Sequence, residues 1–200
     1  ATGTLTVTIT GSNFAPVIDI DSSDLSAEFI EDANFWLDQT GRISFSDGNP
    51  GDTLSVAVTG VVMSGETGSL SEADVLNLMS LYDQQAYSTG WQFSAPNALF
   101  DYLGEGETVT FDFIVSVDDG DESVSTTVSV TVTGSNDQPT VGGGAFEFVS
   151  EDDAPVTIDL LDGASDVEGD ALTVINVAVA TENGAAVDYT LDPATGELTI

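Results

Sequence analysis

The sequence predicts an all-β protein made of tandem β-sandwiches, and three observations lead to this prediction. Val, Thr, Ser, Asp and Gly dominate the composition, which favours strands joined by many turns. Several stretches alternate polar and β-branched apolar residues, as strands with one buried face do. One of these stretches occurs twice, as TLTVTITGSNFAPV at residues 4–17 and as TVSVTVTGSNDQPT at residues 127–140. A strand pattern repeated together with its Gly-Ser-Asn end indicates domains in tandem, each closed by its last strand.

The repeat divides the chain into three parts. We expect residues 1–12 to be the closing strand of an upstream repeat, with apolar side chains alternating along one side. Residues 13–135 are predicted to form a first β-sandwich, and residues 136–200 a second one that is truncated. The second part lacks a hairpin like the one that ends the first. Its open sheet edge should therefore be mobile, or should pair with residues 1–11 of a neighbouring molecule.

Within the first sandwich, short strands are predicted at residues 28–30, 43–45 and 53–59. Trp91 and Phe93 alternate inward on a further strand. The strongest strand signal covers residues 108–117, and the turn Asp118-Asp119-Gly120-Asp121 returns the chain along residues 124–132 as a hairpin.

One short inserted helix is predicted at about residues 71–82. Ser71 can cap its start, Asp74 occupies the third helical position, and apolar residues follow at helical spacing. Residues 98–103 are predicted to form a helical turn.

The second domain repeats parts of the first. Residues 147–152 resemble residues 28–32 with one insertion, and residues 165–174 resemble residues 46–56 with one deletion. The two domains are therefore expected to be variants of one plan.

Charge excludes several classes of function. The chain has 35 acidic residues and a single basic one, Arg42, which gives a net charge of −34. Nucleic acids and anionic membrane surfaces need Lys and Arg, so neither is expected as a partner.

Without Lys, His or Cys there is no Schiff base, no Ser-His-Asp or Cys-His system and no ordinary zinc site. A pair of carboxylates could act as a glycosidase, but no particular pair is marked, and we expect no enzyme activity.

The acidic residues near the predicted domain hinge indicate a metal site. The first and last strands of such a sandwich run the same way, so an acid after the first strand should lie near the hinge. The turn at residues 166–170 should face that hinge from the second domain. The expected ligands are Glu31, Asn136, Asp137, Asp166, Glu168 and Asp170.

Carboxylates about 4 Å apart repel each other by roughly 1–4 kcal/mol per pair. Any single Asp in so acidic a chain is best interpreted as an ordinary turn residue on a solvated surface. The whole set recurs in both domains and offers only oxygen ligands, which suits Ca²⁺. The sequence therefore predicts a Ca²⁺ site at the domain junction.

Several motifs together resemble the VCBS repeat, a family of bacterial immunoglobulin-like modules. They are Glu31-Asp32, Gly41-x-Ile43-x-Phe45-x-Asp47, Trp91-x-Phe93, LGEGET at residues 103–108, Asp118-Asp119-Gly120 and VTGSNDQP at residues 132–139. The resemblance covers about residues 14–141, and residues 140–200 are similar to the related cadherin-like bacterial repeat. It implies immunoglobulin- or cadherin-like sandwiches in a giant extracellular adhesin of the repeats-in-toxin (RTX) type, displayed on the bacterial cell surface after type I secretion.

The cadherin pattern also implies Ca²⁺ ligands at Glu31, Asn136, Asp137, Asp166 and Glu168. The directions of the first and last strands lead independently to the same residues. A second site, expected to be weaker or half-occupied, would lie above the first domain. Phe14 replaces an acid there, and Asn49 replaces the second acidic residue of the turn. Its residues are Asn13, Asp47, Asn49, Asp118, Asp119 and Asp121.

The leading hypothesis is a structural extender of a large bacterial surface adhesin that serves cell adhesion or biofilm formation. Neighbouring repeats of the same chain are its expected partners, without direct membrane contact and as a monomer. The alternative is a Ca²⁺-dependent carbohydrate-binding module with Trp36, Trp91 or Tyr102 as the sugar platform. Of these, Trp36 is the better candidate, because Trp91 has the alternation of a core residue. We expect no significant glycan binding.

Overall fold

The computed structural model describes residues 3–143 and 154–200. The chain divides into two compact units, Ala1–Ser135 (unit 1) and Asn136–Ile200 (unit 2).

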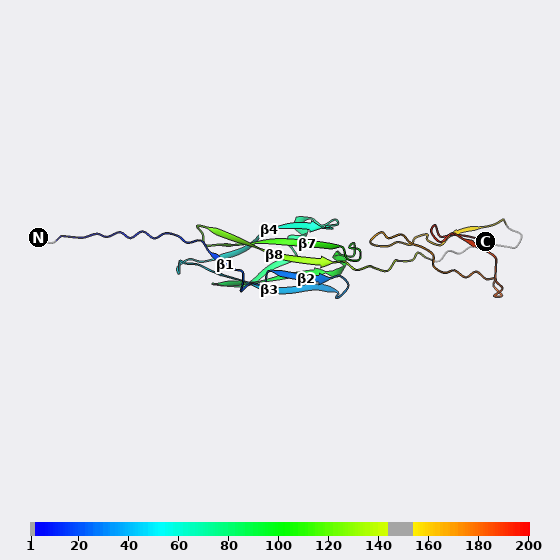
Figure 1. Ribbon diagram of the computed structural model, residues 1–200, viewed down its shortest axis with the longest axis horizontal. Coiled ribbons are helices and arrows are strands. Elements are labelled where there is room, and N and C mark those ends of the chain that lie inside the picture. The colour runs from blue at the N-terminus through cyan, green and yellow to red at the C-terminus, as the bar shows by residue number, and fades with distance from the viewer. Residues whose placement is uncertain (1–2, 144–153) are drawn as a thin grey trace. The chain divides into compact units, whose positions relative to one another are not determined.

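Unit 1 contains two four-stranded sheets (Figure 1). The first has the order β1-β3-β6-β5, with bounds Val17–Asp19, Trp36–Ser46, Ser88–Pro96 and Met79–Gln85. The second has the order β2-β8-β7-β4, with bounds Ser26–Ile30, Ser123–Thr133, Thr108–Asp118 and Ser55–Gly65. The predicted all-β class is confirmed.

The strands follow the alternation of the sequence. Along β7 the side chains of one face are fully buried, namely Val109, Phe111, Phe113, Val115 and Val117. Along β8 the buried side chains are Val128, Val130 and Val132. The two strands pair antiparallel from Thr108↔Thr133 to Asp118↔Ser123, so the predicted hairpin is confirmed.

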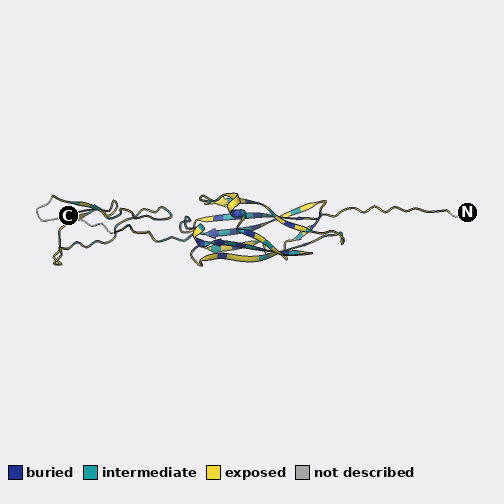
Figure 2. Cartoon of the chain, turned by 180° about the vertical axis from the view of Figure 1, so that it is seen from behind, coloured by how far each residue is buried: buried dark blue, intermediate teal, exposed yellow. Residues whose placement is uncertain are grey.

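Aromatic rings join the two sheets of unit 1. Phe93 on β6 stacks on Phe111 of β7, with ring centroids 6.3 Å apart, and lies 6.2 Å from Phe113. Burying one such ring stabilises the fold by about 1.5–3 kcal/mol, and each aromatic pair adds about 0.5–1.5 kcal/mol. Figure 2 shows the buried segments running through the strands of unit 1. This core makes unit 1 a rigid support for its loops.

The inserted helix is shorter than predicted. α1 spans Glu72–Leu76, and Ser71 and Asp74 form the expected capping box at its start. The predicted end at about residue 82 is wrong, because β5 begins at Met79 and pairs with β6, placing Leu81 opposite Trp91. Sheet pairing and burial against the core outweigh the local helical pattern there. The predicted helical turn begins as η1, a 3-10 helix at Asn97–Leu99.

Strands β2 and β8 lie side by side and run parallel, unlike all other strand pairs of the two sheets. Both therefore end at the same end of unit 1. Glu31, which follows β2, donates its backbone N–H to the Thr133 carbonyl at 2.8 Å. The expectation that Glu31 lies near the end of the last strand of its domain is thus confirmed.

Residues 3–16 are assigned no strand. Leu5, Val7 and Ile9, which alternate along this segment, are 87%, 71% and 88% exposed. An isolated strand has no ladder to satisfy its backbone and gains no order from its pattern alone. The assignment of residues 1–12 to an upstream repeat stays a prediction.

Unit 2 contains a small sheet in the order β10-β11-β9, with bounds Thr190–Leu191, Glu197–Thr199 and Thr157–Asp159. An isolated bridge joins Thr140 to Ser165. It repeats the pairing of Val17 with Ser46 in unit 1, which supports the sequence correspondence of residues 165–174 with residues 46–56. The other predicted correspondence, at residues 147–152, lies outside the described residues.

A close contact in unit 1 gives a stability prediction. Gly41 on β3 pairs with Trp91, and a Cβ atom at position 41 would lie 2.5 Å from the indole ring. Gly41→Ala should therefore destabilise unit 1 by about 1–3 kcal/mol, as overpacking does. Chemical denaturation followed by Trp fluorescence measures this. The matched control is Gly60→Ala on β4, where the new methyl would meet only Ile114, at an ordinary 3.7 Å. Equal stability of the two variants would contradict the prediction.

Candidate metal centres

The entering chain meets two acidic turns of unit 1. The Asn13 side-chain amide donates to Asp119 Oδ2 at 3.0 Å, which ties the segment to the β7–β8 turn. The backbone N–H of Phe14 donates to Asn49 Oδ1 at 2.8 Å. Asn49 in turn donates its backbone N–H to Asp47 Oδ1 at 2.5 Å. Four of the six residues predicted for the first-domain site thus come together.

A group of three carboxylates lies at this place, and we call it the entry cluster. Asp47, Asp52 and Asp119 each offer an oxygen, and these oxygens all lie within 4.8 Å of one another. Asp47 Oδ2 is buried and accepts no hydrogen bond from the described part of the chain. Asp52 is not among the ligands predicted from the sequence. The recurrence of Gly51-Asp52 as Gly169-Asp170 was a signal that could have identified it.

The surroundings of the entry cluster shift the pKa of Asp52. Desolvation, followed by the charges of Asp47, Asp119 and Asp121, raises the pKa of Asp52 above its ordinary value. The anionic form of Asp52 is therefore disfavoured where no cation balances the group. A bound cation would reverse this effect by adding positive charge to the cluster.

Asp119 has the opposite shift. Hydrogen bonds from the Glu122 backbone N–H, the Asn13 side chain and the Asp121 backbone N–H lower its pKa. The other two predicted acids of this turn lie outside the entry cluster. Asp118 Oδ1 accepts the backbone N–H two residues later at 2.8 Å, and Asp121 contributes its backbone N–H. The β7–β8 turn thus orients one carboxylate, Asp119, towards the cluster.

Unit 2 brings its hinge residues onto its own acidic turn. The backbone N–H of Asp137 donates to Glu168 Oε1 at 2.7 Å. Asp166 Oδ1 accepts the backbone N–H groups of Glu168 at 3.2 Å and Asp170 at 3.1 Å. The Asn136 side chain donates to the Asp137 carbonyl at 2.6 Å. Five of the six residues predicted for the junction site are therefore associated within unit 2.

The two units use the same hinge-to-turn hydrogen bond. In unit 1 it runs from the backbone of Phe14 to the side chain of Asn49, and in unit 2 from the backbone of Asp137 to the side chain of Glu168. Both acceptors stand two residues after the first Asp of the turn. In unit 2 the second oxygen of the acceptor, Glu168 Oε2, is buried and accepts no hydrogen bond among the described residues.

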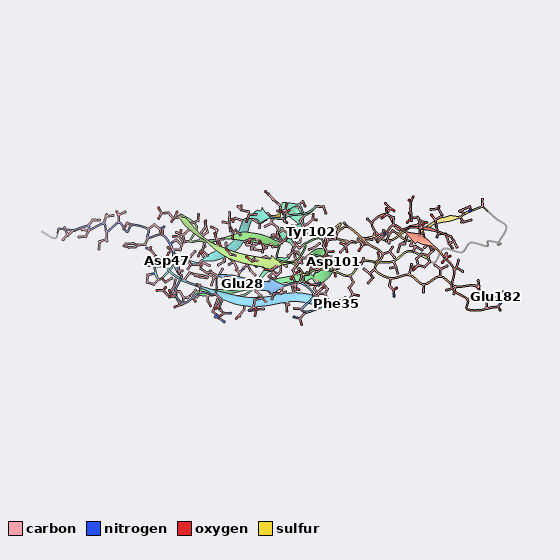
Figure 3. All side chains as sticks on the ribbon, turned by 45° about the vertical axis from the view of Figure 1, so that its right-hand side comes forward. Glu28, Phe35, Asp47, Asp101, Tyr102 and Glu182 are labelled. Carbon is pink, nitrogen blue, oxygen red and sulfur yellow. The ribbon has the colours of Figure 1, made fainter. Side chains whose placement is uncertain are left out.

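The sixth predicted ligand, Glu31, lies at the other end of unit 1 from Asp47. Its side chain is 1% exposed, and its Oε2 accepts the backbone N–H of Ser135 at 3.3 Å. A carboxylate oxygen of Asp101 lies within 4.8 Å of one of Glu31. Figure 3 shows Asp47 and Asp101 at opposite ends of unit 1. Asp101 was not predicted, because it follows η1 and has no counterpart among the repeated motifs.

The donor atoms fit a hard cation. The entry cluster and the unit 2 turn offer carboxylate, amide and backbone oxygens without nitrogen or sulfur, which suits Ca²⁺. The buried Asp47 Oδ2 and Glu168 Oε2 are oxygens that such an ion would satisfy. Ion binding is therefore the chemistry that these groups can perform.

The aromatic residues proposed as a sugar platform lie in different surroundings. Trp91 is fully buried and donates its Nε1–H to the Asp24 carbonyl at 2.7 Å. Tyr102 is partly buried, its hydroxyl donates to the Glu66 carbonyl at 2.9 Å, and burial raises its pKa. Trp36 is 51% exposed. Trp91 is thus excluded as a platform, and Trp36 is accessible.

Comparison with known proteins gives one family match. Residues 135–196 match the family described as cadherin-like domain. This range contains the acidic turn and most of the hinge of unit 2. No curated protein matches the chain. The C-terminal part of the chain is thus similar to a cadherin-like domain.

The solved structures that match this chain include two protocadherins. The extracellular domain of protocadherin gamma B4 is 13% identical with a TM-score of 0.41, and the match covers 92% of this chain and 28% of that one. Cadherin domains 1–4 of protocadherin gamma B7 are 13% identical with a TM-score of 0.38, and the match covers 92% of this chain and 42% of that one. An endo-fucoidan hydrolase of glycoside hydrolase family 107 is 19% identical with a TM-score of 0.36, and the match covers 96% of this chain and 24% of that one. The chain spans less than half the length of each.

The entry cluster predicts opposite effects of one substitution with and without metal. In metal-free protein, Asp52 favours the folded state only when its carboxyl group is protonated. This contribution to stability is complete below the pKa that Asp52 has in the unfolded chain, and it is lost as the pH rises through the raised pKa that Asp52 has in the folded chain. Asp52→Asn should therefore raise the melting temperature in chelator at pH 7. It should also reduce the increase in melting temperature that Ca²⁺ produces, because a ligand is lost.

Calorimetry at pH 7, with Ca²⁺ and with chelator, measures both effects. Glu28→Gln, an exposed acid on β2 outside the cluster, is the control and should change neither (Figure 3). A lower melting temperature of Asp52→Asn in chelator, together with a normal response to Ca²⁺, would contradict the assignment.

Proposed function

We propose that this chain is a structural extender segment of a large bacterial surface adhesin, whose tandem domains are stiffened by Ca²⁺. The cadherin-like domain points to an extracellular, adhesion-type module without catalytic function. Adhesion to a surface or within a biofilm, the RTX context and type I secretion are the finer parts of the proposal. They rest on the motifs shared with the VCBS repeat.

The observation that carries the proposal is the hinge-to-turn hydrogen bond found in both units. A hinge has few apolar contacts, so its direction depends on polar contacts with the domain that it enters. In each unit that contact is made to an acidic turn with a buried, unsatisfied carboxylate oxygen. A cation bound there would fix the hinge to the turn by bonds much stronger than one hydrogen bond.

In unit 1, Asp47, Asp52 and Asp119 would hold the ion, and Asn13 and Asn49 would orient the entering chain. In unit 2, Asp166, Glu168 and Asp170 are the corresponding groups on the turn, with the hinge residues Asn136 and Asp137 against them. Ca²⁺ would supply positive charge and bonds to several oxygens at once when bound. The turns hold part of this oxygen set in place, because the carboxylates of Asp47, Asp119 and Asp166 each accept backbone N–H groups.

Net charge supports the same function. A chain of charge −34 opposes its own compaction, and divalent cations relieve this repulsion. A secreted extender would meet Ca²⁺ only after leaving the cell, so folding and stiffening would be coupled to export. Within the described part of the chain, no helix has the length and apolarity needed to cross a bilayer.

The test compares solution shape and stability with and without the ion. Ca²⁺ should raise the melting temperature in proportion to occupancy and narrow the distribution of interdomain angles seen by small-angle scattering. Mg²⁺ at equal concentration should do much less, since it demands a tighter octahedral site. Superimposable scattering profiles and equal melting temperatures in Ca²⁺ and chelator would overturn the proposal.

Removing one ligand should weaken the unit 2 site specifically. Asp166 accepts two backbone N–H groups of its turn, and its carboxylate is a proposed ligand. Asp166→Asn should raise the Ca²⁺ dissociation constant of this site about tenfold or more, and leave the fold of unit 1 intact. Isothermal titration measures the affinity, and Asp188→Asn, an exposed acid of unit 2, is the matched control. Identical titrations for both variants would exclude Asp166 as a ligand.

A further inference from the structure

A polar pocket of about 410 Å³ opens between two turns of unit 1. One wall is the turn after β3, with Asp47, Asp52 and Thr53, and the other is the β5–β6 turn, with residues 84–87. Neither residues 3–14 nor unit 2 contributes to the lining. Asp47, labelled in Figure 3, marks the end of unit 1 at which the pocket lies. The volume is within the range of about 300–1,000 Å³ that is usual for small-molecule sites.

The β5–β6 turn is held in place by contacts on both sides. Asp83 has a φ of 48°, in the left-handed region, and its Oδ1 accepts the Gln85 side-chain amide at 2.7 Å. The Gln84 side-chain amide donates to a backbone carbonyl of β4 at 3.3 Å, and the Tyr87 carbonyl accepts a backbone N–H of β3 at 3.0 Å. A residue other than glycine keeps such a φ only where its surroundings enforce it. This wall of the pocket is therefore formed before any ligand binds.

Several polar groups of the walls are not used by the fold. The hydroxyl groups of Tyr87 and Thr53 make no hydrogen bond within the described part of the chain. The side-chain carbonyl oxygens of Gln84 and Gln85 accept none there either. The first two groups can donate or accept a hydrogen bond, and the other two can only accept one. They are therefore available to a ligand that carries hydroxyl groups.

Tyr87 also supplies an accessible aromatic ring, because it is 62% exposed and lines the pocket. Leu54, which packs against the core, adds a second apolar side chain to the lining. Aromatic rings with a polar end suit ligands that are apolar on one face and polar at the edge. A sugar ring has this character, since its C–H groups form the face and its hydroxyl groups the edge.

We propose that this pocket binds a neutral sugar, with the sugar ring stacked on Tyr87 and its hydroxyl groups bonded to Thr53 and Gln85. Acidic sugars are disfavoured, because the net charge is −34 and the carboxylates of Asp47 and Asp52 line the pocket. This binding goes beyond the extender function. It rests on the proposed Ca²⁺ site in one respect, since the ion would neutralise these two carboxylates of the wall.

The sequence pointed to other residues and to no significant glycan binding. Trp36, Trp91 and Tyr102 were the aromatic residues predicted as a sugar platform, and none of them lines this pocket. Tyr87 has no local signal for binding, because its position beside the turn after β3 follows from the pairing of β6 with β3 and β5. The two expectations differ in which aromatic side chain matters, so substitutions can distinguish them.

The test is binding of the full chain, in Ca²⁺, to an array of neutral and acidic glycans. The best-bound neutral oligosaccharide is then used for isothermal titration. Tyr87→Ala should raise the dissociation constant about tenfold or more, as loss of a central aromatic contact does. Tyr82→Ala is the matched control, because Tyr82 is 45% exposed on the neighbouring strand β5 and does not line the pocket. It should bind the oligosaccharide as the wild type does.

A second pair of variants tests the polar contacts without removing a ring. Thr53→Val keeps the shape of the side chain but removes its hydroxyl group, and it should weaken binding several-fold. Thr40→Val, at an exposed position of β3 outside the pocket, should not. Each variant should keep the increase in melting temperature that Ca²⁺ produces, so failure of the sugar site and failure of the Ca²⁺ site are measured separately.

Three results would overturn the proposal. The first is an array on which no neutral glycan binds. The second is binding that Tyr87→Ala and Thr53→Val leave unchanged, which would place the sugar elsewhere. The third is binding of positively charged ligands that Ca²⁺ abolishes, with no neutral glycan bound, which would make the pocket a site for cations alone.

Discussion

The excess of carboxylates limits how this chain can satisfy its polar groups. With 35 acidic residues and one basic residue, ion pairs cannot organise this chain. The single Arg42 forms only an exposed pair with Asp83 at 4.0 Å, which contributes little. Acidic side chains must instead be held by backbone N–H groups, and the turns after β3 and between β7 and β8 are built in this way. Those same turns carry the carboxylates that we propose as Ca²⁺ ligands.

The core of unit 1 makes this arrangement possible. Phe93, Phe111 and Phe113 join the sheets, and the long β7–β8 hairpin fixes the ends of the sandwich. Because β2 and β8 run parallel, the residues after them share one end, while the entering chain and the β7–β8 turn share the other. Acidic groups therefore gather at both ends of the sandwich. The sides of the sandwich carry the solvated polar faces of the strands.

Unit 2 keeps only part of the plan of unit 1 among its described residues. It keeps the hinge-to-turn hydrogen bond and the strand bridge of unit 1. However, among its described residues only Leu198 is a buried apolar side chain. Ile18 packs against the core in unit 1, but its counterpart Val141 is exposed. The contact of the hinge with the turn thus occurs in both units, whereas burial of these apolar side chains is seen in unit 1.

Local sequence patterns were enough to predict the β class, the β7–β8 hairpin, the capping box of α1 and most of the residues at the acidic turns. These follow from alternation, turn composition and repetition, which are properties of neighbouring residues. The folded chain was needed to place residues 79–82 in a strand, because their pairing with β6 outweighs a helical pattern. It also decided that Asp52 joins the entry cluster and that Asp101 approaches Glu31, whereas Asp118 and Asp121 stay outside the cluster. The convergence of carboxylates from separate turns depends on how distant strands end, and no local pattern carries that information.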